Sequence, residues 1–325
     1  MQRLALNPCD APVWANSGHG QTIAGHFLKS PVLPTNGQKF KVDLPDGDRL
    51  FYYVREGHSD YVVALFHGLS GDVTSDYMQR TALICQELGH TAVLVNHRGA
   101  GEGVLEAKRP YHSGSTEDMS VVLRQLRAQF PSKKVIAVGY SLSGNILLSL
   151  LGGFRTDERP DGAITVNAPL LLGKGSLLLQ KGLNRLYDIR FVLRLRRLIE
   201  EKYRHGIISE RYNVPPWATL YMFDEIYTAP ASGFRNRQDY YDQCSSIQYV
   251  HQIQTPTYVL TAADDPFIDV QDYLGASFSK HCQVHIEKRG GHMGYIAKNP
   301  ISQWGHRWLD YYLYEALKAL THTLT

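Results

Sequence analysis

The amino-acid sequence predicts an α/β fold with a mostly parallel central sheet, flanking helices and an inserted helical cap. Two observations lead to this prediction. Short, nearly continuous apolar runs alternate with amphipathic helical patterns, as expected for a parallel sheet that is covered on both faces. The strand rhythm stops near residue 170 and resumes near residue 250. We therefore expect a single domain over residues 1–325, with about 170–250 forming a helical cap insertion.

The elements follow in order along the chain. Residues 39–54 alternate apolar and polar side chains around Pro45-Asp46-Gly47, which predicts an antiparallel hairpin. Ser115 is a candidate N-cap of a helix that Pro131 ends. The remaining strands are expected at 61–66, 91–95, 135–139, 163–166, 255–262 and 283–288, and the helices at 76–88, 116–130, 142–151 and from about Ser302 to Leu320.

The composition excludes several classes of protein. The chain is 43% hydrophobic and 20% charged, as in an ordinary globular protein, and its net charge of +3 is too small to indicate a nucleic-acid partner. The first twenty residues lack the apolar core of a secretory signal, and no apolar run is long enough to span a membrane. A cytoplasmic location is therefore expected.

Metal and cofactor chemistry is not expected. The four cysteines are far apart and form no CxxC pair, which argues against a disulfide framework and a thiolate zinc site. His281, Cys282 and His285 lie around one predicted strand but have no fourth partner nearby. No metal and no organic cofactor are predicted.

One segment of the insertion is strongly basic. Residues 181–205 hold eight Lys or Arg against three Asp or Glu, so they carry more positive charge than the whole chain. A solvated helix face, with arginine stems packed on apolar neighbours, is the favoured interpretation. Peripheral contact with an anionic membrane through this basic segment stays open as an alternative.

Ser141 is the candidate nucleophile. It lies in Gly139-Tyr140-Ser141-Leu142-Ser143-Gly144, directly between a predicted strand and a predicted helix. A strand-to-helix turn this tight requires small residues two before and two after the serine, and it projects the hydroxyl at the helix N-terminus. Gly139 meets this requirement, whereas Ser143 stands where a second glycine is usual.

Backbone N–H groups near this serine are candidate donors to a developing oxyanion. Phe66-His67-Gly68-Leu69 ends an earlier strand, and in this architecture the loop after that strand supplies one donor. The amides of Leu69 and Leu142 are therefore the expected oxyanion hole. His67 is expected to orient the loop.

A serine nucleophile needs a base and an acid that orients the base. Asp264-Asp265-Pro266 follows a late strand, and Gly290-Gly291-His292 follows the final strand. This order, serine then acid then histidine, is the one expected for a nucleophile elbow. Pro266 fixes the chain after Asp265, so we favour Asp265 over Asp264 as the acid, with Asp264 bracing the loop.

The sequence resembles the YheT-like branch of the α/β-hydrolases, which includes EMB-eight-like and several ABHD proteins. The similarity extends along nearly the whole chain and lies in the blocks FHGLSG (66–71), NHRGAGEG (96–103), YHSGSTED (111–118), GYSLSGN (139–145), YYDQCSS (240–246), DDPF (264–267) and GGHMGY (290–295). The resemblance implies Ser141, Asp265 and His292 as charge-relay residues. The usual block there is GYSLGGN, so Ser143 is a departure. The resemblance also implies hydrolysis of lipid-like or medium-chain acyl esters.

We therefore predict a serine hydrolase that acts on a small-molecule carboxylic ester through an acyl-enzyme. Transfer of the acyl group to an alcohol is the first alternative, because it differs only in what attacks the acyl-enzyme. A non-catalytic protein that binds ligands in the same cleft is the second. The sequence leaves open the acyl chain, the alcohol part and the oligomeric state.

Overall fold

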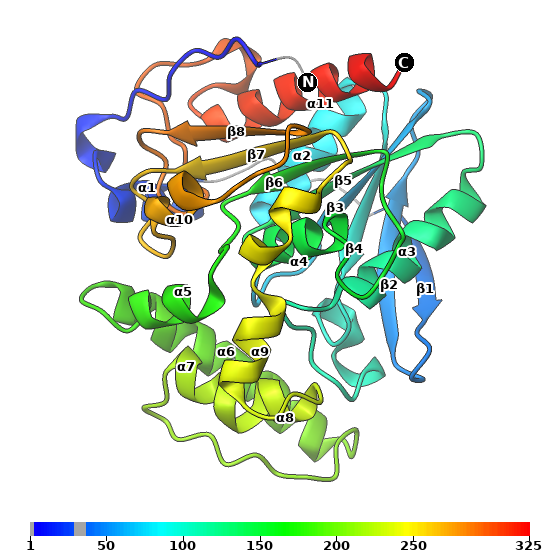
Figure 1. Ribbon diagram of the computed structural model, residues 1–325, viewed down its shortest axis with the longest axis vertical. Helices are drawn as coiled ribbons and strands as arrows, with labels where there is room; N and C mark the ends of the chain where they lie inside the picture. The colour runs from blue at the N-terminus through cyan, green and yellow to red at the C-terminus, as the bar shows by residue number, and fades with distance from the viewer. Residues whose placement is uncertain (1–2, 29–36) are drawn as a thin grey trace.

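The structure is a computed structural model that describes residues 3–28 and 37–325. An eight-stranded sheet lies at its centre (Figure 1), with the strand order β1-β2-β4-β3-β5-β6-β7-β8. The strands are β1 Gln38–Asp43, β2 Arg49–Arg55, β3 Tyr61–Phe66, β4 Thr91–Asn96, β5 Lys134–Tyr140, β6 Gly162–Val166, β7 Thr257–Ala262 and β8 Cys282–Glu287.

The sheet is mostly parallel, as the sequence predicted. β1 and β2 form the predicted antiparallel hairpin, and β2 also pairs antiparallel with β4. The other five pairings, from β4–β3 to β7–β8, are parallel. The carboxyl ends of these parallel strands therefore meet at one edge of the sheet, where ligands bind in open α/β sheets.

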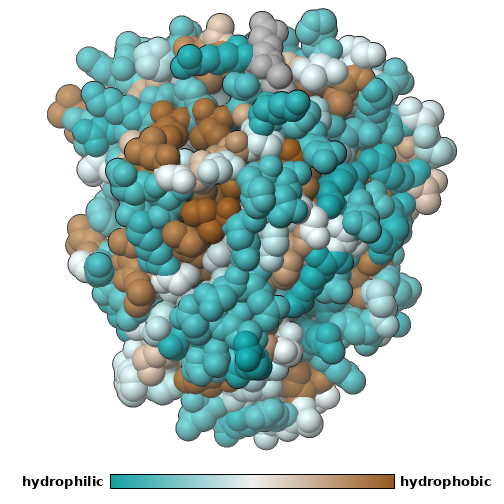
Figure 2. All heavy atoms as spheres, viewed as in Figure 1, coloured by the Kyte–Doolittle hydropathy of each residue, from teal (hydrophilic) through white to brown (hydrophobic). Residues whose placement is uncertain are grey.

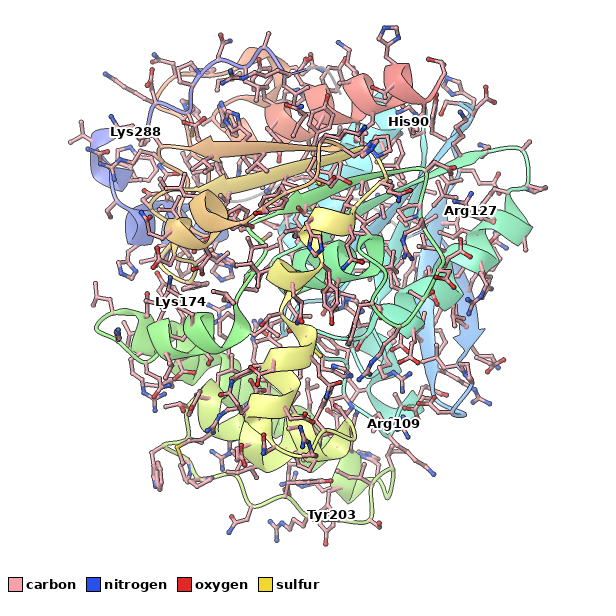
Figure 3. All side chains as sticks on the ribbon, in the orientation of Figure 1. His90, Arg109, Arg127, Lys174, Tyr203 and Lys288 are labelled. Atoms are coloured by element: carbon pink, nitrogen blue, oxygen red, sulfur yellow. The ribbon has the colours of Figure 1, made fainter. Side chains whose placement is uncertain are left out.

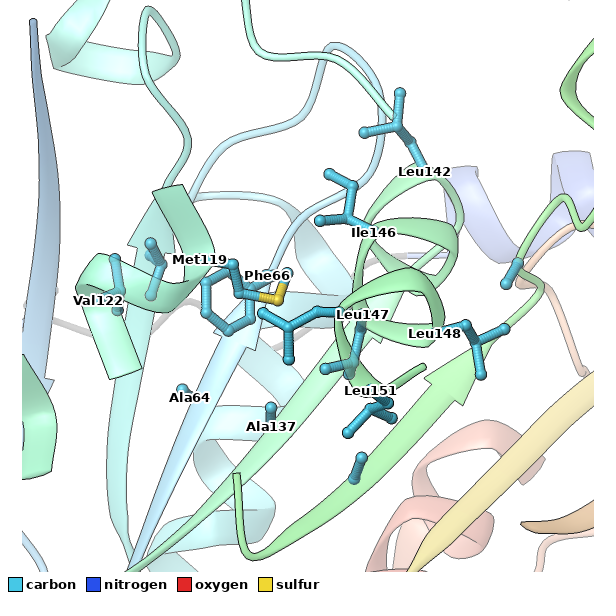
Figure 4. Close-up of a cluster of buried hydrophobic side chains, with 14 of the residues drawn as sticks. Ala64, Phe66, Met119, Val122, Ala137, Leu142, Ile146, Leu147, Leu148 and Leu151 are labelled. Atoms are coloured by element: carbon cyan, nitrogen blue, oxygen red, sulfur yellow. The ribbon is translucent and has the colours of Figure 1, made fainter. Parts of the chain in front are cut away.

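Helices cover both faces of the sheet, which explains why the central strands read as continuous apolar runs. In β3, Val62, Ala64 and Phe66 point into one buried cluster, and Val63 and Leu65 into the other. The first cluster lies under α3 (Thr116–Gln129) and α4 (Leu142–Leu151), as Figure 4 shows. The second lies under α2 (Asp76–Glu87) and α11 (Trp308–Leu324).

Between β6 and β7 the chain forms helices and no strand. This insertion packs beyond the carboxyl edge of the sheet, in the lower part of Figure 1. Its α- and π-helices are α5 Leu172–Leu178, α6 Asn184–Arg204, α7 Leu220–Phe223, a π-helix Asp224–Thr228, α8 Ala229–Ala231 and α9 Arg237–Cys244, and two short 3₁₀ helices, Ser246–Gln248 and Val250–Gln252, lead to β7. That the chain is one domain and that these helices act as a cap stay predictions.

An ion pair fastens the insertion to the core. Lys174 on α5 lies where the insertion approaches the sheet (Figure 3). Its Nζ is 2.7 Å from an oxygen of Asp269 and 2.6 Å from one of Asp272, which belong to the start of α10 (Val270–Gly275). Helix α10 was not predicted from the sequence.

One local prediction was wrong, and a second was confirmed only for the position of the residue. The final helix begins at Trp308 and not near residue 302, because Gly305 adopts a φ of 57° and separates it from a short 3₁₀ turn at 302–304. Ser115 stands at the N-cap of α3, but its hydroxyl accepts from the His112 N–H at 2.9 Å and does not cap the helix.

The sequence analysis also missed α1 (Gly18–Phe27). This helix packs against the loops that follow β7 and β8, where Gly18 and Gly25 allow close approach. A Cβ on Gly18 would lie 1.7 Å from the Asp264 carbonyl oxygen, and one on Gly25 would lie 2.5 Å from Gly294 Cα. Within residues 3–28 and 37–325, no helix has both the length and the apolar character that crossing a bilayer requires.

Candidate active site

Ser141 occupies a strained turn between β5 and α4. Its φ of 51° and ψ of −117° are unusual for a residue with a side chain, and such strain is concentrated at functional sites. The turn is held by the Ser141 N–H, which donates to the Val166 carbonyl at 2.8 Å. Gly139 is required here, because a Cβ would lie 2.5 Å from the Ser143 carbonyl oxygen. The local geometry is that of a nucleophile elbow.

Ser143, the departure from the usual block, is fully buried and bonded on both sides. Its Oγ donates to the His67 carbonyl at 2.5 Å and lies 2.6 Å from His97 Nε2, which makes that nitrogen the donor. The hydroxyl thus connects the start of α4 to the loops after β3 and β4. A glycine could not make these bonds.

The structure brings Ser141, His292 and Asp265 into one hydrogen-bonded chain. Ser141 Oγ lies 2.9 Å from His292 Nε2, and His292 Nδ1 lies 2.8 Å from Asp265 Oδ2. The Asp265 side chain is fully buried, and the His292 side chain is 11% exposed. Phe267 covers one face of the imidazole, with ring centroids 4.4 Å apart. Each of the three residues follows the carboxyl end of a parallel strand.

Asp264, the alternative acid, points elsewhere. Its Oδ1 accepts from the N–H groups of Gly290 and Gly291, both at 2.9 Å. Its other oxygen lies 3.7 Å from the Arg289 guanidinium. Asp264 therefore braces the loop that carries His292, and it is Asp265 that contacts the imidazole.

Asn167 supports the acid and was missed by the sequence analysis. Its Nδ2 donates to Asp265 Oδ2 at 2.6 Å and to the Gly291 carbonyl at 3.2 Å, and its Oδ1 accepts from the Tyr295 hydroxyl at 2.9 Å. Its φ is 49°, in the left-handed region that Asn tolerates better than most residues. The signal in the sequence is an Asn directly after a buried strand.

Helix α1 also supports the histidine loop. The His292 N–H donates to Thr22 Oγ1 at 2.9 Å. Gln21 is fully buried, and it donates to the Ile296 carbonyl at 3.1 Å and accepts from the Ile296 N–H at 2.6 Å. The three glycines in GHGQTIAG (18–25) are the only hint in the sequence that this helix lies close to other backbone.

The loop after β3 lies beside the serine. A Cβ on Gly68 would be 3.1 Å from Ser141 Cβ, so this backbone passes close to the elbow. His67 is fully buried, with its Nδ1 2.8 Å from the Gly68 carbonyl and its Nε2 accepting from the His97 N–H at 3.2 Å. Burial lowers the pKa of His67 to about 4, so it holds the loop as a neutral side chain.

A pocket of about 1100 Å³, counting the part open to solvent, connects these groups. Ser141, His292, Leu69 and Leu142 line it from the core, and Leu172, Phe191, Leu195 and Phe223 are among the residues that line it from the insertion. Figure 2 shows hydrophobic side chains gathered on this face between α10 and the insertion, whereas the lower part of the face is mostly hydrophilic. A lining of this kind favours apolar ligands.

No three His, Cys, Asp or Glu side chains come together as a metal site in the part of the chain that the structure describes. His281, Cys282 and His285 do not converge on one point with a fourth ligand. His285 Nε2 lies 3.1 Å from Glu287, and Cys282 Sγ lies 3.8 Å from Ser279 Oγ.

The sheet order, the elbow and the Ser–His–Asp chain together define an α/β-hydrolase. The family described as alpha/beta hydrolase fold matches residues 61–298, and the chain belongs to it. Among curated proteins, it is 33% identical to the Escherichia coli protein named "Putative esterase YheT", over 86% of this chain and 84% of that one.

Other relatives and solved structures agree with this placement. The chain is 26% identical to human "Phospholipase ABHD3" over 87% of this chain and 72% of that one. It is 25% identical to the yeast Saccharomyces cerevisiae "Monoacylglycerol lipase" over 88% and 67%. The Pyrococcus furiosus esterase Pf2001 superposes with a TM-score of 0.59 at 14% identity, covering 90% of this chain and 97% of that one, which shows a shared fold.

Proposed function

We propose that the protein hydrolyses carboxylic esters, with Ser141 as nucleophile, His292 as general base and Asp265 as the acid that orients the base. The observation that carries the proposal is the hydrogen-bonded chain from Ser141 Oγ through His292 to Asp265 Oδ2. It opens into a pocket whose lining is largely apolar. Relatives over most of the chain are named as an esterase, a phospholipase and a monoacylglycerol lipase, which supports the same class of reaction.

The proposed mechanism has two steps. His292 Nε2 takes the Ser141 proton while Oγ attacks the ester carbonyl, and the resulting imidazolium protonates the departing alcohol. Asp265 Oδ2 accepts a hydrogen bond from His292 Nδ1–H, which keeps the proton on Nδ1 and leaves Nε2 free to accept the serine proton. Water then attacks the acyl-enzyme while His292 Nε2 accepts one of its protons. The bond from the acyl carbon to Ser141 Oγ breaks, the imidazolium returns that proton to Oγ, and the carboxylic acid is released.

The oxyanion is assigned to the N–H groups of Leu69 and Leu142. Leu142 is the first residue of α4, so its N–H belongs to a helix N-terminus, where negative charge is favoured. Leu69 follows Gly68, whose backbone passes beside Ser141. Two such donors acting on the tetrahedral intermediate are each worth about 3 kcal/mol in enzymes of this kind.

The test is active-site labelling together with turnover. We expect a fluorophosphonate to label the protein at Ser141, and p-nitrophenyl octanoate to be hydrolysed. Ser141→Ala should abolish labelling and lower kcat by at least about a thousandfold, because only the oxyanion donors and binding remain. Folded parent protein that neither labels nor turns over any ester of a length series would contradict the proposal.

Acyl transfer to an alcohol shares every step up to the acyl-enzyme, and the largely apolar pocket under the insertion would also suit an alcohol acceptor. Product analysis with added ethanol separates the two reactions. Ethyl octanoate as the main product indicates transfer, and octanoate indicates hydrolysis. A non-catalytic binding role predicts instead that Ser141→Ala binds octanoate esters while the parent does not turn them over.

A further inference from the structure

A buried lysine of the insertion lines the same pocket as Ser141. Lys202 lies near the end of α6, and the whole residue is 3% exposed. A Cβ on Gly99, another pocket-lining residue, would lie 2.8 Å from Lys202 Nζ, which places the ammonium at the pocket wall. Figure 3 shows neighbouring Arg109 at the junction between core and insertion. Burying an ammonium group is costly unless something compensates it.

The protein itself compensates little of the positive charge on Lys202. An ammonium group has three N–H donors. Of the described residues, only the Arg109 carbonyl accepts from Lys202 Nζ, at a long 3.3 Å, and no carboxylate lies within 4.0 Å of it. Asp48 attracts the charge from farther away, while Arg98 repels it, and burial lowers the pKa of Lys202 to about 8. The lysine is thus charged at pH 7, and some of its three N–H groups have no acceptor among the described residues.

Three other side chains of the pocket, Arg98, Asp224 and His112, offer no free cation. Arg98 donates to Asp118, Asp46 and Asp48. Asp224 accepts from the Tyr241 hydroxyl at 2.7 Å. Burial lowers the pKa of His112 to about 3, so that ring is neutral. Lys202 is therefore the cation that a ligand in this pocket would meet with free donors.

Helix α6 sets the distance between Lys202 and the triad. Phe191 on the same helix packs on Phe267, with ring centroids 6.1 Å apart, and Phe267 packs on His292. At about 1.5 Å per residue, Lys202 lies about 16 Å farther along the helix axis than Phe191. The apolar side chains of Leu195, Leu198 and Ile199 line the stretch between them.

We propose that Lys202 binds an anionic group, a carboxylate or a phosphate, at the end of the substrate remote from the ester carbonyl. The protein would then prefer esters whose medium-length apolar middle lies along α6 and whose far end is charged. This substrate class rests on the proposed ester hydrolysis. The anion can belong to the acyl chain or to the alcohol, and the two arms of the experiment separate these sources.

The first arm places the anion on the acyl chain. The kcat/KM values of p-nitrophenyl nonanoate and of the p-nitrophenyl monoester of azelaic acid are compared in the parent, Lys202→Met and Arg197→Met. We expect Lys202→Met to lose about tenfold to a hundredfold on the azelaic monoester, mainly through KM, because a hydrogen bond to a charged group is lost. The neutral ester should be hydrolysed as before. Arg197→Met is the matched control, since Arg197 is exposed on the same helix.

The second arm places the anion on the alcohol. Monooctanoylglycerol and its glycerol phosphate counterpart are compared in the same three proteins. A loss confined to the anionic ester in either arm supports the proposal and assigns the anion to that part of the substrate. An equal loss on neutral and anionic esters, or no loss in either arm, overturns it.

Measurements on the parent and on Ser141→Ala cover the case in which Lys202→Met does not fold. In that case the rates of the parent are compared, and hydrolysis of both anionic esters at least tenfold slower than of their neutral counterparts overturns the proposal. If the parent hydrolyses no ester at all, the proposed function fails separately. Calorimetric binding of the azelaic monoester and the nonanoate ester to Ser141→Ala then tests Lys202, and tighter binding of the neutral ester counts against it.

Discussion

At the scale of single residues, the geometry of the proposed triad depends on a side chain to which the proposal gives no chemical step. Asn167 is fully buried and donates to the same Asp265 oxygen that accepts from His292. It therefore limits the rotation of the carboxylate and, through the Gly291 carbonyl, holds the histidine loop. We infer that Asn167 is a positioning residue for the proposed reaction.

Replacing Asn167 tests this role. We expect Asn167→Ala to lower kcat about tenfold with little change in KM, because a misplaced Asp265–His292 pair weakens the transition state and not substrate binding. The variant should also lose about 1–3 kcal/mol in its free energy of unfolding, because it leaves the Tyr295 hydroxyl without its partner. Ester kinetics and urea unfolding measure the two effects.

Asn145→Ala is the matched control for Asn167→Ala. Asn145 is also fully buried, and its side chain bonds the carbonyls of Ser113 and Cys244 and the Ser246 N–H. It contacts Ser141 only through its backbone N–H, which the alanine variant keeps. It should lose similar stability but keep kcat in the folded protein. If both variants lose kcat equally, Asn167 has a structural role only.

At the scale of elements, α6 presents two different faces. One face lines the pocket, as described above. The outer face carries exposed Leu186, Ile189 and Leu193 beside exposed Arg190 and Arg194. Arg190 lies 2.9 Å from His26 Nε2, so this face continues onto α1, where Phe27 is 73% exposed. Apolar and basic side chains on one helix face are typical of binding to an anionic bilayer.

We therefore expect the protein to bind vesicles that contain phosphatidylglycerol. The double variant Arg190→Gln with Arg194→Gln should lower the partition coefficient about thirtyfold, because each basic residue near an anionic surface contributes about 1 kcal/mol. Vesicle co-sedimentation measures this, and added salt should weaken the binding of the parent.

A double variant with the same change of charge controls for net charge. Arg204 and Arg211 lie near Glu200, away from α1, and replacing both with Gln should leave vesicle binding nearly unchanged. If both double variants lose vesicle binding equally, net charge alone explains the binding. If the parent protein does not bind the vesicles, the membrane interpretation is excluded and the outer face of α6 is a solvated helix face.

At the scale of the whole molecule, the predictable features are those that depend on local pattern. Continuous apolar runs identified the strands, and the carboxyl ends of parallel strands meet at one edge, so Ser141, Asp265 and His292 could be expected to converge. The contacts of α1 with Asp264, and of Lys202 with Gly99, join residues far apart in sequence. Apart from the closely spaced glycines of α1, such contacts leave no local pattern, so their partners could not be predicted.

A buried ion network is the clearest long-range contact of this kind. Arg98, in the loop after β4, donates to Asp46 and Asp48 in the β1–β2 turn and to both oxygens of Asp118 on α3. The side chains of Arg98 and Asp118 are 9% and 6% exposed. Burial raises the pKa of Asp118 above its usual value, and the guanidinium opposes this rise. One cation thus joins the hairpin, a strand end and a helix.

Removing that cation should destabilise the entire fold. We expect Arg98→Leu to lose about 3–5 kcal/mol in the free energy of unfolding at pH 7, because it strands buried carboxylates. In the variant their folded-state pKa values should rise above the unfolded ones, so its stability falls as pH rises through that range. The deficit should therefore be smaller near pH 4 than at pH 7, as urea unfolding at both pH values can measure.

Arg127→Leu is the control: Arg127 pairs with Glu158 and Asp161 but is 38% exposed, so its loss should stay under about 1 kcal/mol. An Arg98→Leu deficit that matches the control, or that grows as pH falls, would contradict the role of the network.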